Sequence, residues 1–163
     1  MAADEYASLS LRINRLNKKL NEVATRDQDC VRLKSIPGIG SINATAIVSA
    51  IADGYQFNNA REFAVWLGLT PRQASSGERS ASFGITKRGN RYLRTQLVHG
   101  ARALLFRTRH RDDHLSLWTQ ELVQRRGVHK ATVALAAKLA RRCWTLLDKQ
   151  QHYITNYSAT KTV

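Results

Sequence analysis

The sequence has few cysteines and no long apolar segment. Its two cysteines, Cys30 and Cys143, lie far apart, and neither belongs to a Cys-x-x-Cys pair. This spacing excludes a disulfide framework and argues against a structural zinc site. No apolar run reaches the roughly 18 residues that predict a membrane span, and Met1 is followed by Ala-Ala-Asp-Glu rather than by a basic and then an apolar stretch. We therefore expect a soluble, cytoplasmic protein with no membrane partner and two buried or incidental thiols.

Acidic residues are also scarce. The chain of 163 residues has 12 Asp and Glu against 26 Lys and Arg, which gives a formal net charge of +14. Between residues 72 and 111, Glu78 is the single acid among ten bases. Lys and Arg that neutralise phosphates release condensed counterions, so this surplus predicts binding to nucleic acid. A solvated basic face without a partner is the alternative, although such single-sign fields are more often used for binding or steering.

The hydrophobic pattern predicts a mainly α-helical fold. With 43% hydrophobic residues the chain can bury a core, and it shows neither a fixed repeat nor an alternating βα pattern. Residues 1–31 predict a coiled-coil-like arm, because apolar side chains recur there every three or four positions. These side chains are Tyr6, Leu9, Ile13, Leu16, Leu20 and Val23. A helix packed on its own domain fits the stripe equally well, since the stripe is short for a coiled coil.

Residues 32–150 are predicted to form the main domain. Asn59 can cap a helix that has Glu62 three residues later, and another helix begins after Asn90. Two further helices are expected over about residues 115–125 and 130–149, on either side of Gly127.

Two segments do not follow helical spacing. Residues 70–90 are rich in Ser, Gly and charge, and predict an irregular Ser/Gly loop with room for a short hairpin. The polar tail, residues 151–163, is expected to fray.

Pro37-Gly38-Ile39-Gly40 separates two helical patterns and has the form of a helix-hairpin-helix. Glycines let the backbone approach a phosphate closely, and the N–H groups that start the second helix point toward it. Through Gly38 and Gly40 such a turn would grip a nucleic-acid backbone without reading bases. A simple turn between helices, which needs glycine only for its backbone angles, is the alternative.

A second motif surrounds a pair of serines. A serine hydroxyl is a weak nucleophile, but one set in a glycine-flanked loop and ringed by guanidiniums could attack a phosphodiester, because the cations stabilise the developing charge. A Ser-Ser-Gly segment that is only a turn is the alternative. The motif consists of Gly68-Leu69-Thr70-Pro71-Arg72-Gln73-Ala74-Ser75-Ser76-Gly77 and, further on, Gly84-Ile85-Thr86-Lys87-Arg88-Gly89-Asn90-Arg91-Tyr92-Leu93-Arg94. The cations predicted to bind nucleic acid are Arg72, Lys87, Arg88, Arg91, Arg94 and Arg102.

Metal sites are not expected in this chain. His110 and His114 have the spacing of a helical metal pair, but no Glu accompanies them in the H-E-x-x-H manner, so solvated histidines are favoured. The acids show no paired pattern, which disfavours a two-metal nuclease site. Trp66, Trp118 and Trp144 fit apolar helix faces better than base-stacking platforms.

Over about residues 33–105 the chain resembles the C-terminal domain of the insertion-sequence transposases of the IS-one-ten and IS-one-one-one-one type, the bridge-RNA-guided recombinases. The resemblance rests on four segments in combination, each of which is weak alone. They are Ile36-Pro37-Gly38-Ile39-Gly40, Phe63-Ala64-Val65-Trp66-Leu67-Gly68-Leu69-Thr70-Pro71, Ser75-Ser76-Gly77 and Ile85-Thr86-Lys87-Arg88-Gly89-Asn90-Arg91-Tyr92-Leu93-Arg94.

This resemblance implies a DNA strand-exchange enzyme in which a serine becomes covalently joined to DNA. The serine next to the glycine is Ser76, with Ser75 as the second candidate. Full-length members also carry an N-terminal RuvC-like domain with acidic metal ligands, joined through a coiled coil. We expect that domain to be missing here, so that the chain is a truncated gene product or an excised C-terminal part, and the arm is the rest of the coil and a route to homo-oligomers. Guide RNA and magnesium are implied for the complete protein, and we expect no cofactor in this chain.

Three functions therefore remain open. The leading hypothesis is the DNA-binding, catalytic-serine domain of a transposase that acts in strand cleavage and exchange. The others are a non-catalytic helix-hairpin-helix module that binds nucleic acid, and a small basic structural protein bound to RNA. The Ser-Gly motif favours the first, since a binding module does not need it.

Overall fold

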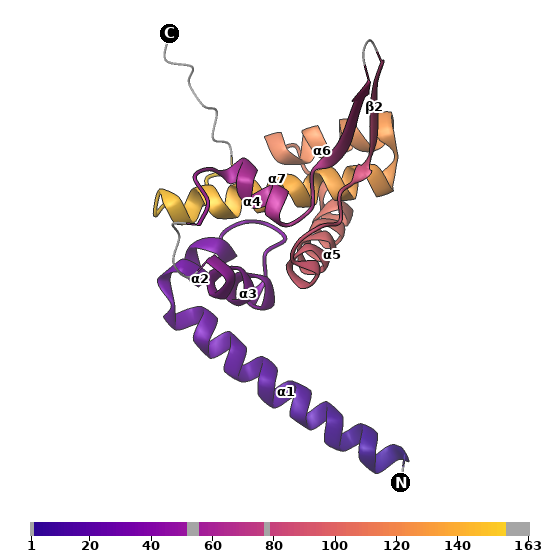
Figure 1. Cartoon of the computed structure of the whole chain (residues 1–163). Helices are drawn as coiled ribbons and strands as arrows, with labels where there is room; N and C mark the ends of the chain where they lie inside the picture. The colour runs from indigo at the N-terminus through magenta and orange to yellow at the C-terminus, as the bar shows by residue number, and fades with distance from the viewer. Residues whose placement is uncertain (1, 52–55, 77–78, 156–163) are drawn as a thin grey trace.

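The computed structural model describes residues 2–51, 56–76 and 79–155, without the side chains of residues 73–83. In this part of the chain it contains seven helices and a two-stranded hairpin (Figure 1). The elements are α1 (Ala2–Arg26), α2 (Gln28–Lys34), α3 (Ser41–Ile51), α4 (Ala60–Trp66), β1 (Pro71–Ser76), β2 (Arg79–Ile85), α5 (Arg91–Thr108), α6 (His114–Arg126) and α7 (Val128–Asp148). The mainly α-helical fold class is thus confirmed.

The segment predicted as an irregular Ser/Gly loop with room for a short hairpin forms an antiparallel hairpin. Its strands pair from Pro71 opposite Ile85 to Ser76 opposite Arg79, with an irregularity near Pro71. β1 is predominantly polar, whereas β2 alternates Ala81, Phe83 and Ile85 with Ser80, Ser82 and Gly84, a pattern typical of a strand. The prediction of an irregular loop is thus wrong over the paired residues, whereas the short hairpin that it allowed is present.

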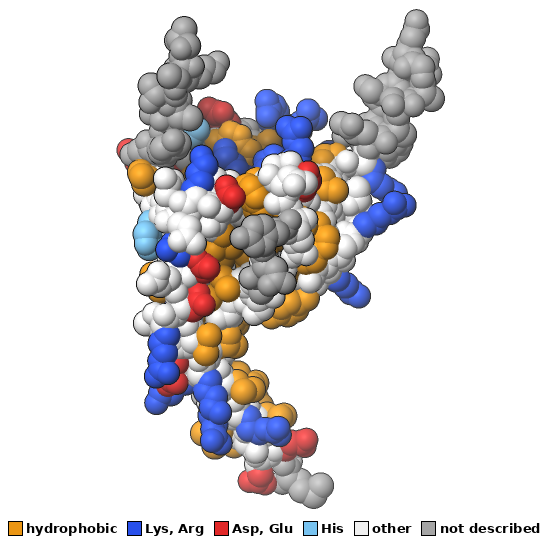
Figure 2. All heavy atoms as spheres, turned by 60° about the vertical axis from the view of Figure 1, so that its left-hand side comes forward, with side chains coloured by type: hydrophobic (Ala, Val, Ile, Leu, Met, Phe, Trp, Pro, Cys, Tyr) orange, Lys and Arg blue, Asp and Glu red, His pale blue; other side chains and the backbone are white. Residues whose placement is uncertain are grey.

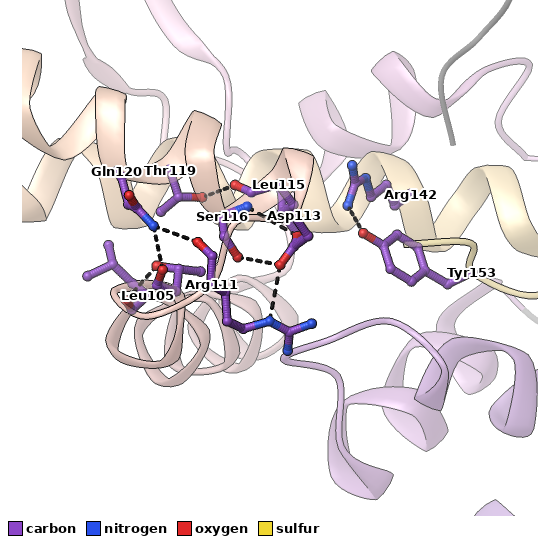
Figure 3. Close-up of polar contacts among 10 residues, drawn as sticks. Leu105, Arg111, Asp113, Leu115, Ser116, Thr119, Gln120, Arg142 and Tyr153 are labelled. Carbon is purple, nitrogen blue, oxygen red and sulfur yellow. Dashed lines mark hydrogen bonds and ion pairs between the residues drawn. The ribbon is translucent and has the colours of Figure 1, made fainter. Parts of the chain in front are cut away.

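Side-chain caps explain why three of the helices begin where they do. The Asn59 side chain accepts hydrogen bonds from the backbone N–H groups of Arg61 and Glu62 at the start of α4. Asn90 accepts one from the N–H of Leu93 in α5, as its place in the sequence predicts. Asp113 caps α6 by accepting from both the backbone and the hydroxyl of Ser116 (Figure 3).

The core forms where α7 packs against α2, α4, α5 and α6. Leu93, Leu97, Ala101 and Leu104 of α5 are buried, as their spacing predicts. The three tryptophans pack against this core, which confirms their assignment to apolar helix faces. In the part of the chain that the structure describes, no helix is long and apolar enough to cross a membrane.

Both cysteines are free and buried. Burial raises the pKa of Cys143 to about 12 and, together with nearby Asp27, raises that of Cys30 to about 11. Neither thiol therefore forms a thiolate readily near neutral pH, which fits the expectation of buried residues with no chemical role.

Helix α1 projects from the helical body as an arm (Figure 1). Among its residues only Ala24 is buried, and it contacts the rest of the chain through α2 and α3. Its apolar stripe is open to solvent, with Tyr6 76% and Leu16 61% exposed. Figure 2 shows hydrophobic side chains along this arm beside Lys and Arg. The stripe is therefore not packed on its own domain, which removes one of the two interpretations of the sequence.

The start of the C-terminal tail is held against the fold. The backbone N–H of Tyr153 donates to the hydroxyl of Ser35 at 2.9 Å, and the phenol of Tyr153 accepts from Arg142 at 2.8 Å (Figure 3). The expectation of fraying therefore does not hold at Tyr153, because this side chain packs against the core. Residues 156–163 lie outside the described part.

Candidate nucleic-acid and nucleophile site

The turn between α2 and α3 gives its two glycines different roles. Gly38 has φ +90° and lies against α5, where an added Cβ would be 2.9 Å from the carbonyl oxygen of Gly100. Gly40 is exposed, with open space around it, and directly precedes α3. The first turn of α3 contains no acid to offset its free N–H groups. The geometry thus gives Gly38 a packing role and leaves Gly40 accessible.

This turn and α5 are brought together, although the sequence separates them by about fifty residues. Gly38 lies close to Gly100 of α5. A hydrogen bond also links α3 to α5, because the side-chain amide of Asn43 donates to the carbonyl of Gln96 at 3.2 Å. The two elements predicted to bind nucleic acid are therefore neighbours.

Two glycines interlock at the foot of the hairpin. Gly68 has φ +68°, and a Cβ there would lie 2.0 Å from the carbonyl oxygen of Arg88. Gly89 has φ +89°, and a Cβ there would lie 1.7 Å from the carbonyl oxygen of Trp66. The N–H of Lys87 also donates to the carbonyl of Gly68 at 3.2 Å. Only glycine allows these backbones to touch, so the two segments of the motif form one structural unit.

Arg94 braces this unit. Its Nη1 donates to the carbonyl of Leu67 at 2.9 Å and to that of Arg88 at 3.3 Å. Its side chain is half-buried, whereas Arg91, one turn earlier, is exposed. The sequence grouped Arg94 with Arg91 as a phosphate contact, but the structure directs Arg94 toward main-chain carbonyls.

The two candidate nucleophiles lie at the far end of the hairpin. Ser75 and Ser76 are the last residues of β1, opposite Ser80 and Arg79 in the backbone register. Gly77, the next residue of the motif, lies outside the described residues. At about 3.3 Å per residue, the strand carries Ser76 roughly 16 Å from Pro71 at its foot. Arg88 and Arg91 lie near the foot, whereas the backbone of Ser76 lies at the far end of the hairpin.

Five of the predicted phosphate-binding cations are exposed and available. They are Arg72, Lys87, Arg88, Arg91 and Arg102. None of them has an ion-pair partner among the described residues. Lys87 has φ +57°, an uncommon conformation for a side chain other than glycine, next to the Gly68 contact. The foot of the hairpin and α5 thus present positive charge that no ion pair among the described residues neutralises.

Comparisons with known proteins place these features in a family. The transposase family IS116/IS110/IS902 matches residues 30–115, which include every candidate residue from Gly38 to Arg102. The chain belongs to this transposase family. It is 45% identical over 136 residues to the transposase for insertion sequence element IS1111A of Coxiella burnetii, covering 83% of this chain and 37% of the relative. It is 43% identical over 150 residues to a probable family 20 transposase of Pseudomonas aeruginosa, covering 92% of this chain and 44% of the relative.

This transposase chain spans less than half the length of the curated relatives that it matches. The same holds for the transposase for insertion sequence element IS1328 of Yersinia enterocolitica, at 35% identity over 86% of this chain and 42% of the relative. The activity of a whole transposase of this family is therefore a matter for proposal here.

The magnesium that the resemblance assigns to a RuvC-like domain would need a cluster of acidic ligands. Within the described ranges, no three His, Cys, Asp or Glu side chains are grouped to hold a metal. His110 lies between α5 and α6, and His114 begins α6, so the two do not share a helix face.

The prediction from the sequence did not single out two exposed aromatic residues on α5 of the transposase chain. Tyr92 is 57% exposed and Phe106 is 56% exposed, and the guanidinium of Arg109 lies 5.6 Å from the centre of the Phe106 ring. Helical spacing could have revealed them, since neither falls on the stripe of Leu93 and Leu97. Exposed aromatics among arginines add stacking surface to a cationic helix.

Proposed function

We propose that this chain is the DNA-binding, catalytic-serine part of an insertion-sequence transposase. The observation that carries the proposal is the hairpin, which presents Ser75 and Ser76 away from the helical body while its foot is fixed by the interlocked Gly68 and Gly89. A fixed foot gives the strand that carries the serines a defined origin, which supports a positioned nucleophile.

The proposed reaction joins the serine to DNA. The Ser76 oxygen forms a bond to phosphorus while the bond from phosphorus to a DNA oxygen breaks. That oxygen leaves with a proton, and the serine proton passes to a base. The positions of Arg88 and Arg91 support a role in holding the DNA backbone rather than in activating Ser76. The activating groups, and magnesium where it is needed, would then come from a RuvC-like domain.

DNA would be held by phosphate contacts at two neighbouring places. Arg91 and Arg102 are exposed on α5, and the open N-terminus of α3 at Gly40 lies beside that helix. Phosphate contacts of this kind position a protein on a duplex without reading its sequence. A structured guide RNA would bind the same cations. The exposed apolar stripe of α1 would form the interface between two copies of the chain.

A covalent adduct tests the nucleophile. The chain is combined with the N-terminal part of a full-length relative and a nicked or branched DNA, and denaturing electrophoresis detects protein joined to DNA. Ser76→Ala should abolish the adduct while binding stays nearly intact, and Ser80→Ala on the opposite strand is the matched control. Loss in Ser75→Ala with persistence in Ser76→Ala would move the nucleophile by one residue. Persistence in both would refute the proposal.

A non-catalytic helix-hairpin-helix module is the second candidate. The turn before α3 supports it, because Gly40 is open and no acid follows in the first turn. This function predicts DNA binding that depends on the turn and is nearly unaffected when the hairpin residues 73–84 are replaced by a short linker, which leaves Arg72 in place.

A further inference from the structure

A cavity of about 420 Å³ lies beside the second half of α7, away from the hairpin, α3 and α5, none of which contributes a residue to it. Its walls come from α7, the first residue of α6, Lys149 directly after α7, and residues 151–155. The basic side chains that line it are His114, Lys138, Arg141, Arg142, Lys149 and His152. No carboxylate from the described residues lines it. Its volume lies within the range of small-molecule sites.

Two of the cations are fixed by aromatic rings. The ammonium of Lys138 lies 3.7 Å from the centre of the Trp118 ring. The guanidinium of Arg142 lies 5.0 Å from the centre of the Tyr153 ring and donates to its hydroxyl (Figure 3). Tyr153 is itself tied to Ser35 through its backbone. These contacts hold the cavity in shape before any ligand arrives, which lowers the entropic cost of binding.

Two other cations of the cavity, Arg141 and Lys149, are accessible to a ligand. Arg141 and Lys149 are exposed, and neither side chain has an ion-pair partner in the described part of the chain. Burial lowers the pKa of Lys138 to about 8, and repulsion from the charges of Arg142 and Arg141 adds to this effect. An anion bound among them would relieve this repulsion.

We propose that this cavity binds a phosphate ester, with Arg141 and Lys149 as its mobile contacts and Lys138 and Arg142 as its fixed wall. Guanidinium and ammonium groups around a preformed hollow match the charge and the several acceptor oxygens of a phosphate. The phosphate would come from a free nucleotide or from a nucleic-acid strand. The site is independent of the serine chemistry, so either proposal can fail without the other.

The test uses the full chain in isothermal titrations with adenosine monophosphate, with adenosine as the uncharged probe, and with a short single-stranded oligonucleotide. Work at physiological ionic strength screens contacts between distant exposed charges. The variant Arg141→Gln with Lys149→Gln removes two charges from the cavity. The matched control, Arg125→Gln with Arg126→Gln, removes two exposed charges from the last turn of α6, outside the cavity. Thermal unfolding checks that both variants fold.

We expect the wild type to bind adenosine monophosphate but not adenosine. The cavity variant should bind at least about tenfold more weakly, and the control within about twofold of the wild type. Displacement of the oligonucleotide by the mononucleotide would identify a free nucleotide as an occupant. Cavity-dependent binding of the oligonucleotide alone would identify a strand phosphate. Equal weakening in both variants, or a wild type indifferent to every phosphate probe, would overturn the proposal.

Discussion

Arg91 and Arg94 stand one turn apart on α5, and the structure predicts that replacing each with alanine has opposite consequences. Arg94→Ala removes two hydrogen bonds from a guanidinium to main-chain carbonyls at the foot of the hairpin. Hydrogen bonds to charged groups contribute roughly 1.5–3 kcal/mol. Because this side chain is only half-buried, we expect the free energy of unfolding to fall by about 2 kcal/mol. Arg91→Ala removes an exposed side chain, and its stability should stay within about 0.5 kcal/mol of the wild type.

The same pair should differ in DNA binding. The loss of one phosphate contact lowers the slope of log affinity against log salt by about 0.9 for duplex DNA. Arg91→Ala should show this change on DNA of any sequence, whereas Arg94→Ala should leave the slope unaltered while the fold is intact.

Urea unfolding and binding measured over a range of salt concentrations check both quantities. If Arg94→Ala flattened the salt slope as much as Arg91→Ala and cost no stability, the division between a binding and a bracing arginine would be wrong.

Three further predictions follow from other parts of the fold. Gly89→Ala should destabilise the chain by about 3 kcal/mol or more in urea unfolding, because Gly89 has a positive φ and its added Cβ would lie 1.7 Å from a backbone oxygen. The control Gly84→Ala places its Cβ in open space and should change stability by less than about 0.5 kcal/mol. Sedimentation should show the wild type self-associating through α1 and Leu16→Asp as a monomer, whereas a monomeric wild type would exclude the arm as an interface. The pKa of Lys138 is lowered from 10.5 to about 8 in the folded chain, so between these pH values the unfolded chain retains a proton that the folded chain loses. The wild type should therefore gain stability relative to Lys138→Met as the pH rises from about 8 to 10.5. A constant difference in stability between the two proteins would contradict this.

The helices were predictable because their signals are local. Asn59 and Asn90 cap the helices that the sequence places after them, and the α5 stripe that begins at Leu93 is buried. The hairpin was predictable only in part, because β2 alternates apolar and polar residues whereas the polar β1 does not. Its evidence lies in Gly68 and Gly89, which are twenty-one residues apart and meet only in the fold.

The cavity beside α7 could not be predicted, for a related reason. His114, Lys138 and His152 come from three separate segments, and each is unremarkable among the many basic residues of the sequence. What distinguishes the cavity is the absence of carboxylates from its lining and the two aromatic rings beneath its cations, and both depend on packing.

Charge is therefore a guide to the partner but not to the contacts. A net charge of +14 predicts a polyanion, yet Arg94 donates to main-chain carbonyls and Arg142 to a tyrosine hydroxyl. Such arginines keep their charge, but hydrogen bonds within the fold occupy some of their N–H donors and hold them away from DNA phosphates. They therefore displace few of the counterions that are condensed on DNA. The salt slope of DNA binding should accordingly reflect the exposed, unpaired cations of α5 and of the foot of the hairpin, and should fall well below the value that all ten bases between residues 72 and 111 would give.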